Sequence, residues 1–233
     1  MITIRKSEER GPSNFGWLDS KHTFSFGHYY DPQNMGFGNL RVINDDRVDG
    51  GRGFDAHPHN NMEIISYVIE GALEHKDSMG TGSVIKPGDV QHMSAGTGVV
   101  HSEFNHSPTE KVHFLQIWIV PKERDIEPKY NQKYFSEEDK LNKIAKIISP
   151  DGSDNSIEIN QDTTIFASIV DKDGEVKFTP SNDKDYWIHV VQGDINFQEY
   201  NLKEGDGVAI TKGELSEMTF RSSNKGEFLL FEV

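Results

Sequence analysis

The chain has 233 residues, and its 24 Lys and Arg stand against 38 Asp and Glu, so the formal net charge at pH 7 is −14. This acidic excess argues against direct nucleic-acid binding, because phosphate recognition needs clustered Lys and Arg. No segment approaches the roughly 18 to 20 apolar residues of a membrane helix, and residues 1–10 lack the apolar stretch of a signal peptide, so we expect a cytoplasmic protein without a membrane anchor. The chain has no Cys, which excludes disulfides and thiolate ligands and leaves His and carboxylates to hold any metal ion.

Short strands separated by turns dominate the first half of the chain. Residues 63–69 and 114–120 are rich in β-branched and aromatic residues, and Gly, Asp or Pro clusters flank them. The 21 Gly and 9 Pro are spread through the sequence, as in proteins with many turns. The pattern predicts an all-β fold.

One segment interrupts the strand pattern. Ser136 followed by acidic residues 137–139 is typical of a helix N-cap and first turn. Apolar residues then recur at helical spacing: Leu141, Ile144, Ala145 and Ile148. We expect a short helix that ends before Pro150, and we place a domain boundary here, with an N-terminal domain of residues 1–135 and a C-terminal domain of residues 136–233.

The two halves share an order of motifs. In the first half a strand ends at Gly71 and Pro87-Gly88-Asp89 opens a later strand; in the second half a strand ends at Gly193 and Glu204-Gly205-Asp206 follows. The last strand of the second half is expected at 228–233. The repeated order favours duplication of one unit and predicts two β-barrels in tandem.

Two motifs carry candidate metal ligands. His57-Pro58-His59 and His101-Ser102-Glu103 each place two ligands at positions i and i+2, which point to the same face of a strand. If both strands line one barrel, three imidazoles and a carboxylate converge on one point. Such a set suits Fe(II), Mn, Ni, Cu or Zn, and it leaves coordination positions open, as catalytic sites do.

The glycine framework around these motifs resembles the cupin superfamily, and this resemblance makes Glu63 the usual carboxylate ligand, with Glu103 also available. His57-x-His59-x-x-x-Glu63 with Gly53 and Gly71 is similar to the first cupin motif, and Gly88, Gly96 and His101-x-x-x-Asn105 are similar to the second. The chain departs from the pattern at Ser94, where cupins usually have Pro, and by two extra residues between Gly96 and His101.

Longer motifs resemble the pirin family of cupins. They cover roughly the first 120 residues and include Thr23-Phe24-Ser25-Phe26, residues 37–42, His57-Pro58-His59, residues 75–80 and residues 95–103. The resemblance implies two tandem jelly-roll barrels with a short linking helix and a metal ion in the N-terminal barrel. Its ligands would be His57, His59, His101 and Glu103, with Glu63 as a neighbour and not a ligand.

The second half lacks this ligand set. The positions that correspond to His57 and His59 fall on Thr179 and Ser181, and the position of His101 falls on Met218. We therefore expect no metal in the C-terminal barrel and interpret His189 as a strand residue.

Other candidates receive a structural interpretation. We interpret six further histidines as structural or surface residues, with His92 as the one nearest to a site role: His22, His28, His75, His92, His106 and His113. Three phenylalanines could line an aromatic pocket, but strand spacing favours a core role for them: Phe24, Phe26 and Phe37.

The pirin resemblance implies a quercetin 2,3-dioxygenase, in which a flavonol chelates the metal and dioxygen opens its ring with loss of carbon monoxide. Glu103 would then take the proton of the flavonol 3-hydroxyl as general base. Fe(II) is the first choice of divalent ion, with Mn, Co, Ni, Cu and Zn as alternatives. Because two fused barrels already supply the pairing that single cupins obtain by dimerising, we expect a monomer.

Two other functions stay open. Some pirins resemble metal-dependent, redox-sensing proteins that bind a transcription factor or an enzyme and catalyse nothing. A cupin isomerase or a dioxygenase for a small carboxylic acid is a minor alternative, for which Arg41, Arg47 or Arg52 would have to reach the cavity.

Overall fold

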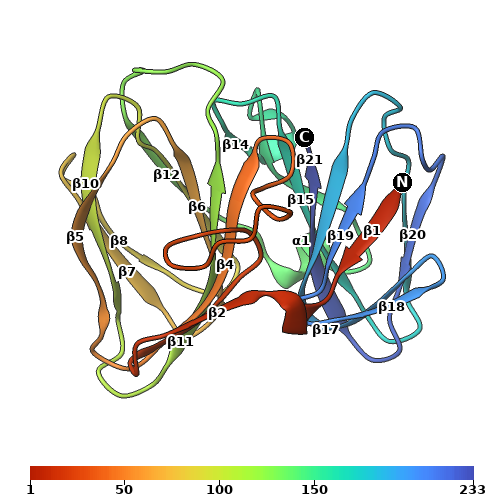
Figure 1. The fold of residues 1–233 in the computed structure, drawn as a ribbon, viewed down its shortest axis with the longest axis horizontal. Helices are drawn as coiled ribbons and strands as arrows, with labels where there is room; N and C mark the ends of the chain where they lie inside the picture. Colours follow the sequence, from red (N-terminus) through yellow and green to blue (C-terminus); the bar gives the residue numbers. More distant parts are fainter. The chain divides into compact units, whose positions relative to one another are not determined.

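The computed structural model describes all 233 residues, and strands make up nearly all of its regular structure (Figure 1). The chain forms two compact units. The N-terminal barrel contains Gly11–Tyr134 and Ile159–Gln161, and the C-terminal barrel contains Met1–Arg10, Phe135–Glu158 and Asp162–Val233. The predicted all-β fold with two barrels is confirmed. None of the helices is long and apolar enough to cross a membrane.

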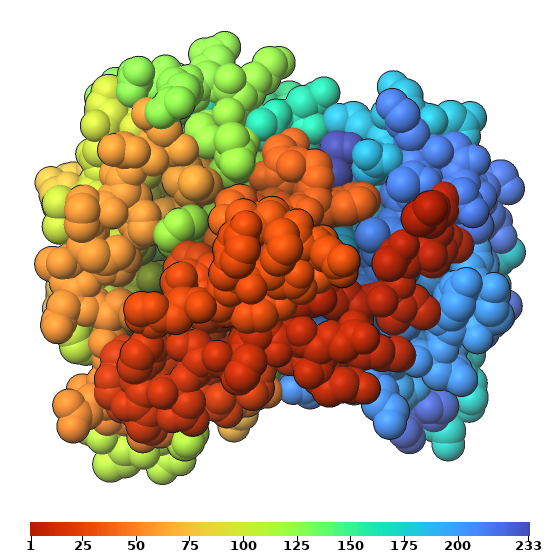
Figure 2. All heavy atoms as spheres, in the orientation of Figure 1, coloured from red at the N-terminus to blue at the C-terminus, as the bar shows by residue number.

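The first strand of the chain belongs to the C-terminal barrel. β1 (Ile2–Arg5) pairs antiparallel with β19 (Gly207–Ile210), and Figure 2 shows the red atoms of the first residues among the blue atoms of that barrel. Ile2 and Ile4 pack against its hydrophobic core, which explains the placement. Residues 1–10 therefore belong to the C-terminal barrel and not to the expected N-terminal domain of residues 1–135. The change of unit between Tyr134 and Phe135 lies beside the expected boundary.

The N-terminal barrel is built from two antiparallel sheets. The larger has seven strands in the order β12-β9-β6-β11-β4-β3-β2. Their bounds are β2 Gly11–Asn14, β3 Leu18–His22, β4 Leu40–Val48, β6 Glu63–Glu70, β9 Asp89–Ser94, β11 Val112–Ile119 and β12 Lys129–Tyr134. The smaller sheet has the order β5-β10-β7-β8. Its strands are β5 Gly53–His59, β7 Leu73–Asp77, β8 Gly82–Ile85 and β10 Val99–Asn105.

The inner face of the larger sheet carries a row of buried polar side chains. Ser66, Gln116, Asn44 and His22 are successive register partners on β6, β11, β4 and β3. Further along the strands the same face is apolar: Val48, Val68 and Phe114 of the larger sheet form a core with Leu73 of the smaller sheet. Buried polar groups need partners, so this row marks the part of the barrel where a site can form.

The C-terminal barrel has the strand order β1-β19-β17-β21-β15-β13-β14; β18 and β20 also pair with β17, and β16 pairs with β20. The remaining bounds are β13 Ala145–Ser149, β14 Ile157–Glu158, β15 Thr164–Val170, β16 Glu175–Phe178, β17 Tyr186–Phe197, β18 Tyr200–Lys203, β20 Met218–Arg221 and β21 Gly226–Glu232. Its interior is filled by apolar side chains, including a stacked pair of Phe220 and Phe228 with ring centroids 4.2 Å apart. This barrel is packed solid where the other is polar.

The predicted helix is shorter than its pattern suggested. α1 spans only Glu137–Lys140, and the expected cap is present, since the Ser136 side chain accepts a bond from the Asp139 backbone N–H. The helix ends at Leu141, and Asn142 has a positive φ of 51°. The expectation that the helix continues through Ile144, Ala145 and Ile148 is wrong: Ala145–Ser149 forms β13. Pairing with β15, which buries Ile148, outweighs the helical spacing. Two 3-10 turns, η1 (Ser7–Glu9) and η2 (Ser153–Asn155), complete the chain.

Candidate metal centre

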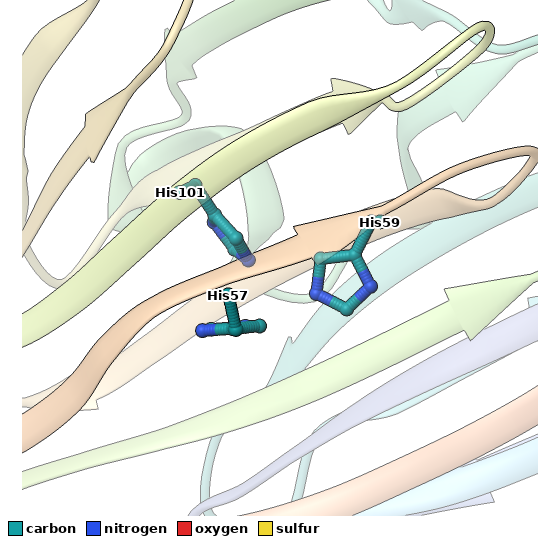
Figure 3. Close-up of side chains that lie close together, drawn as sticks. All are labelled: His57, His59 and His101. Atoms are coloured by element: carbon teal, nitrogen blue, oxygen red, sulfur yellow. The ribbon is translucent and has the colours of Figure 1, made fainter.

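Three histidines from two neighbouring strands converge in the N-terminal barrel (Figure 3). His57 and His59 come from β5 and His101 from β10, and each contributes a nitrogen to a cluster in which the ligand atoms lie within 4.8 Å of one another. The ring centroids of His101 lie 4.5 Å from His57 and 4.9 Å from His59. The structure thus brings together the three imidazoles that the spacing predicted.

A bulge in the β5–β10 pair shapes this cluster. His101 is the register partner of His57 and Glu103 that of Phe54, so Asp55 and Ala56 together lie opposite the single residue Ser102. Such bulges redirect side chains beside functional sites. The carbonyl oxygen of Asp55 lies 2.7 Å from Nδ1 of His57. Because a carbonyl only accepts, Nδ1 of His57 carries the proton and its Nε2 lone pair is free for a ligand bond.

Lowered pKa values keep His59 and His101 in the neutral form that binds metals. Burial, together with the neighbouring His57, lowers the pKa of His59 to about 4. Burial, followed by the neighbouring imidazoles, lowers the pKa of His101 to about 2. Nε2 of His101 is buried and has no hydrogen-bond partner in the protein. A buried nitrogen without a partner costs free energy, and a metal ion bound there would remove that cost. The residues therefore fit one divalent ion.

Glu103 lies next to this cluster, at the polar row of the larger sheet. Its carboxylate groups with His101 and His75, with ligand atoms within 4.8 Å of one another, and not with His57 and His59. Nε2 of Gln116 donates to its Oε2 at 2.6 Å, and the Ser66 hydroxyl lies 3.1 Å from its Oε1. Burial raises the pKa of Glu103 to about 7, although these two hydrogen bonds act against the rise. A carboxyl group that titrates near neutral pH suits proton transfer.

His75 is a neighbour of the site that the sequence interpretation assigned to a structural role. It is fully buried on β7, with Nδ1 3.4 Å from Nδ1 of His101 and Nε2 2.8 Å from Oδ2 of Asp77. Burial acts to raise the pKa of Asp77, but the bonds from His75 and from backbone N–H groups lower it below its ordinary value. His75-x-Asp77 repeats the i, i+2 spacing of the two ligand motifs, and this signal could have found it.

Glu63 and His92 form a separate pair away from the imidazole cluster. Nε2 of His92 lies 2.7 Å from Oε2 of Glu63, and the Ser94 hydroxyl donates to Oε1 at 2.5 Å. Successive residues of a strand point to opposite faces, so Glu63 lies on the face of β6 away from Ser66. Glu63 is therefore not the neighbour of the cluster that the family resemblance implied, and His92 contacts Glu63 and not the site.

A cavity of about 230 Å³ opens in the same barrel. Its walls are aromatic and polar, formed by Phe15, Phe26, His28 and Phe54 together with Ser20, His22, Asn44 and Asp46. Oδ1 of Asn44 and Oδ1 of Asp46 have no hydrogen-bond partner in the protein. Burial, opposed by a hydrogen bond with Ser20, raises the pKa of Asp46 to about 7. Polar groups in this state are available to a bound molecule.

Aromatic rings connect the cavity to the cluster. Phe26, which the sequence favoured as a core residue, lines the cavity and packs edge-on against Trp118 at 5.2 Å. Trp118 in turn packs edge-on against His59 at 4.9 Å. His22, which we interpreted as a structural or surface residue, is buried at the cavity wall, and burial lowers its pKa to about 4.

The fold and the site define a bicupin: the chain forms two β-barrels, and the N-terminal barrel holds a histidine cluster suited to a metal ion. Comparison with known proteins identifies the family. Residues 3–119 match the family model Pirin, and residues 146–233 match the model of the quercetinase C-terminal cupin domain. The chain belongs to the pirin family.

Two relatives and a solved structure are similar to this protein over its full length. It is 43% identical over 233 residues to quercetin 2,3-dioxygenase of Escherichia coli K12, covering 100% of this chain and 99% of that one. It is 38% identical over 237 residues to a putative quercetin 2,3-dioxygenase of Pasteurella multocida, covering both completely. The bacterial pirin YhhW of E. coli in complex with nickel(II) superimposes with a TM-score of 0.94 at 42% identity, covering 100% and 99%.

Proposed function

We propose that this protein is a metal-dependent dioxygenase that opens the ring of flavonols such as quercetin with dioxygen and releases carbon monoxide. The observation that carries the proposal is the cluster of His57, His59 and His101, whose nitrogens converge beside the Glu103 carboxyl group, which burial gives a pKa of about 7. The full-length relatives named quercetin 2,3-dioxygenase support the same reaction.

His57, His59, His101 and Glu103 are the residues we assign to the metal. The bound ion would supply a Lewis acid and a redox centre to a chelating flavonol and dioxygen. We propose Fe(II) as that ion, and the nickel(II) complex of YhhW makes Ni the first alternative. All four residues come from a single barrel of one chain, so the proposed centre needs no second copy.

Glu103 takes the proton of the flavonol 3-hydroxyl in this proposal. Its carboxylate is oriented by Gln116 and Ser66, and its pKa of about 7 lets it accept a proton at neutral pH and release it again. A carboxylate oxygen keeps a second lone pair when it accepts one hydrogen bond, so these contacts leave Glu103 able to approach the metal and the substrate.

The cavity beside the centre is the proposed place for the aromatic substrate. Phenyl rings of Phe15, Phe26 and Phe54 form apolar walls, and the unpartnered oxygens of Asn44 and Asp46 offer acceptors to phenolic hydroxyls. The cavity has a volume of about 230 Å³, and the ring contacts from Phe26 through Trp118 to His59 lead from it toward the proposed metal ligands.

Oxygen uptake tests the proposal directly. Apo protein is reloaded separately with Fe(II), Mn, Co, Ni, Cu and Zn, and each sample receives quercetin under air, with carbon monoxide measured in the headspace. We expect uptake and carbon monoxide in equal amounts with at least one metal, and their loss in His101→Ala. His106→Ala, which alters an exposed imidazole paired with Glu74, serves as the control. Stoichiometric metal binding without turnover for every ion contradicts the proposal and favours the partner-binding alternative.

A further inference from the structure

β7 places two buried side chains behind the metal centre. This strand pairs with β10 so that His75 is the register partner of Glu103 and Asp77 that of His101. The side chains of His75 and Asp77 are fully inaccessible to solvent. The contacts run in a line, with Oδ2 of Asp77 2.8 Å from Nε2 of His75 and Nδ1 of His75 3.4 Å from Nδ1 of His101.

The chemistry of these atoms fixes the direction of each hydrogen bond. Oδ1 of Asp77 accepts the backbone N–H groups of Met79 and Thr81, at 2.9 Å and 3.0 Å, which orients the carboxylate. An ionised carboxylate only accepts, so Nε2 of His75 carries the ring proton. When His75 carries a single ring proton, its Nδ1 is an acceptor, and the proton between the two imidazoles belongs to Nδ1 of His101. The lone pair of His101 is thereby left on Nε2, the buried atom that has no partner in the protein.

We propose that Asp77 and His75 are positioning residues that hold His101 in the tautomer with Nε2 free for the metal. The inference rests on the proposed metal centre and deepens it. Partners that fix the tautomer of a metal-binding histidine are usually single carboxylates or carbonyls, such as the Asp55 carbonyl that fixes His57. His101 instead receives its orientation through a second imidazole.

Tyr130 on β12 completes this arrangement. Its ring lies against that of His75, with centroids 4.9 Å apart and planes tilted by 35°, and its hydroxyl donates to Oε1 of Gln132 at 2.9 Å. The packing restricts rotation of the His75 ring, which would exchange its two nitrogens. The same geometry offers a competing role, since His75, His101 and Glu103 also bring three ligand atoms within 4.8 Å. In that role His75 would itself bind the ion.

The first test needs no variant. Long-range ¹H–¹⁵N correlation spectra of the apo protein at pH 8 report which ring nitrogen of each neutral histidine carries the proton, and His101→Gln and His75→Gln assign the two signals. We expect the proton on Nδ1 in His101 and on Nε2 in His75. A proton on Nε2 of His101 in the wild-type protein overturns the proposal, whatever the protein catalyses.

The second test reverses the line of hydrogen bonds. In Asp77→Asn the amide oxygen can keep the bonds from Met79 and Thr81, which turns the NH₂ group toward Nε2 of His75. His75 must then carry its proton on Nδ1 and donate to His101, whose own proton moves to Nε2 and blocks it. We expect the altered tautomer in the spectrum and a Ni(II) affinity about 10 to 100 times weaker, measured by chelator competition.

Glu74→Gln is the matched control. It removes one negative charge from the same strand at a partly exposed side chain that contacts Lys76 and His106, so Ni(II) affinity should stay within twofold of wild type. An Asp77→Asn protein with unchanged tautomers and unchanged affinity contradicts the inference. If Asp77→Asn does not fold, the wild-type spectrum still tests the inference, because it reports which ring nitrogen of His101 carries the proton.

Cu(II) electron paramagnetic resonance separates the two roles of His75. The nitrogen hyperfine pattern of a His75→Phe protein should still show three imidazoles, because a positioning residue contributes no ligand bond. Loss of one nitrogen identifies His75 as a ligand and overturns the positioning role. These readouts do not depend on flavonol turnover. The proposed reaction can therefore fail while the tautomer assignment stands, and the tautomer assignment can fail while the reaction is observed.

Discussion

His57 and His101 face each other as register partners across the β5–β10 pair, with ring centroids 4.5 Å apart. The bulge that follows this pair lets two residues of β5 span one residue of β10, so the strands stay in contact while His57 turns its Nδ1 to the Asp55 carbonyl. The cluster therefore depends on the backbone of two strands as much as on its side chains.

The ligand role of His57 predicts the effect of its removal. His57→Ala leaves two imidazoles of the cluster, so we expect the bound metal to fall from one equivalent to below about one tenth after desalting, measured by elemental analysis. His57 is half-buried, so the fold should persist. His106→Ala removes an exposed imidazole of the same barrel and should keep full metal content. Equal metal content in both variants would exclude His57 as a ligand.

Gly53 opens β5 where it approaches β10 most closely. A Cβ at this position would collide with the carbonyl oxygen of Glu103, which is backbone and cannot move aside without moving the strand. We expect Gly53→Ala to lower the free energy of unfolding by about 1 to 3 kcal/mol, measured in urea, and to weaken metal binding. Gly82→Ala, on β8 of the same sheet, meets no atom within 4 Å and should change neither. Similar losses in both variants would contradict the argument from close approach.

Gln116 controls the proton affinity of Glu103. Its amide donates to Oε2 at 2.6 Å, and this bond lowers a pKa that burial raises to about 7. Gln116→Leu removes the donor, so the carboxylate should lose its proton only at higher pH. If Glu103 is the general base, the acid limb of the pH–rate profile moves up by about one to two units, since a hydrogen bond to a charged group contributes about 1.5 to 3 kcal/mol.

The control for this change is Gln91→Leu. Gln91 lies on β9 as the register partner of Ser66, on the other side of β6 from Gln116, and it is also buried. Its profile should match wild type. An unmoved acid limb in Gln116→Leu, with metal content intact, would remove Glu103 from the role of general base.

Asp46 makes the stability of the apo protein depend on pH. The pKa of its carboxyl is raised by burial from 3.8 to about 7, so between about pH 4 and 7 the folded protein holds a proton that the unfolded chain has released. Stability from this group is present at low pH and is lost as the pH rises through about 7. Asp46→Asn cannot ionise, so at pH 8 it should be more stable than wild type by on the order of 2 to 4 kcal/mol, with little difference at pH 4.

Urea unfolding of both proteins at pH 4, 6 and 8 checks this difference. His22, His59 and His101 have lowered pKa values and act in the opposite direction, because the unfolded chain takes up protons below about pH 6.5. Both proteins share these groups, so the comparison isolates Asp46. Glu110→Gln, at an exposed carboxylate of the same barrel, should show no such dependence. A constant gap between wild type and Asp46→Asn at all three pH values would show that burial does not hold the proton.

Much of the site could be predicted because its chemistry follows local spacing. Two i, i+2 pairs on strands fix which faces the ligands share, and the alternation of a strand needs no knowledge of the rest of the fold. The register that brings His101 opposite His57 is different, since it depends on a bulge formed by Asp55 and Ala56 that no local pattern announces.

The end of the helix and the positions of His75 and Glu63 could not be predicted, for physical reasons of the same kind. Ile144 to Ile148 fit a helical stripe and a strand equally well over so short a run, and the pairing with β15 decided between them. His75 looked like one of many structural histidines, because its partner Asp77 and its neighbour His101 meet it only after β7 and β10 have paired. Glu63 occupies a cupin-like position in the sequence, but strand alternation turns it toward His92.

The placement of β1 bears on how the chain folds as it is made. Residues 2–5 leave the ribosome well before their partner β19, which begins at Gly207. Gly11–Tyr134 contains nearly all of the N-terminal barrel and can fold once it has emerged from the ribosome. β1, within Met1–Arg10, stays unpaired until β19 has been made. The N-terminal barrel can thus form before β19 exists, and β1 can close its own sheet only after Gly207–Ile210 has been made.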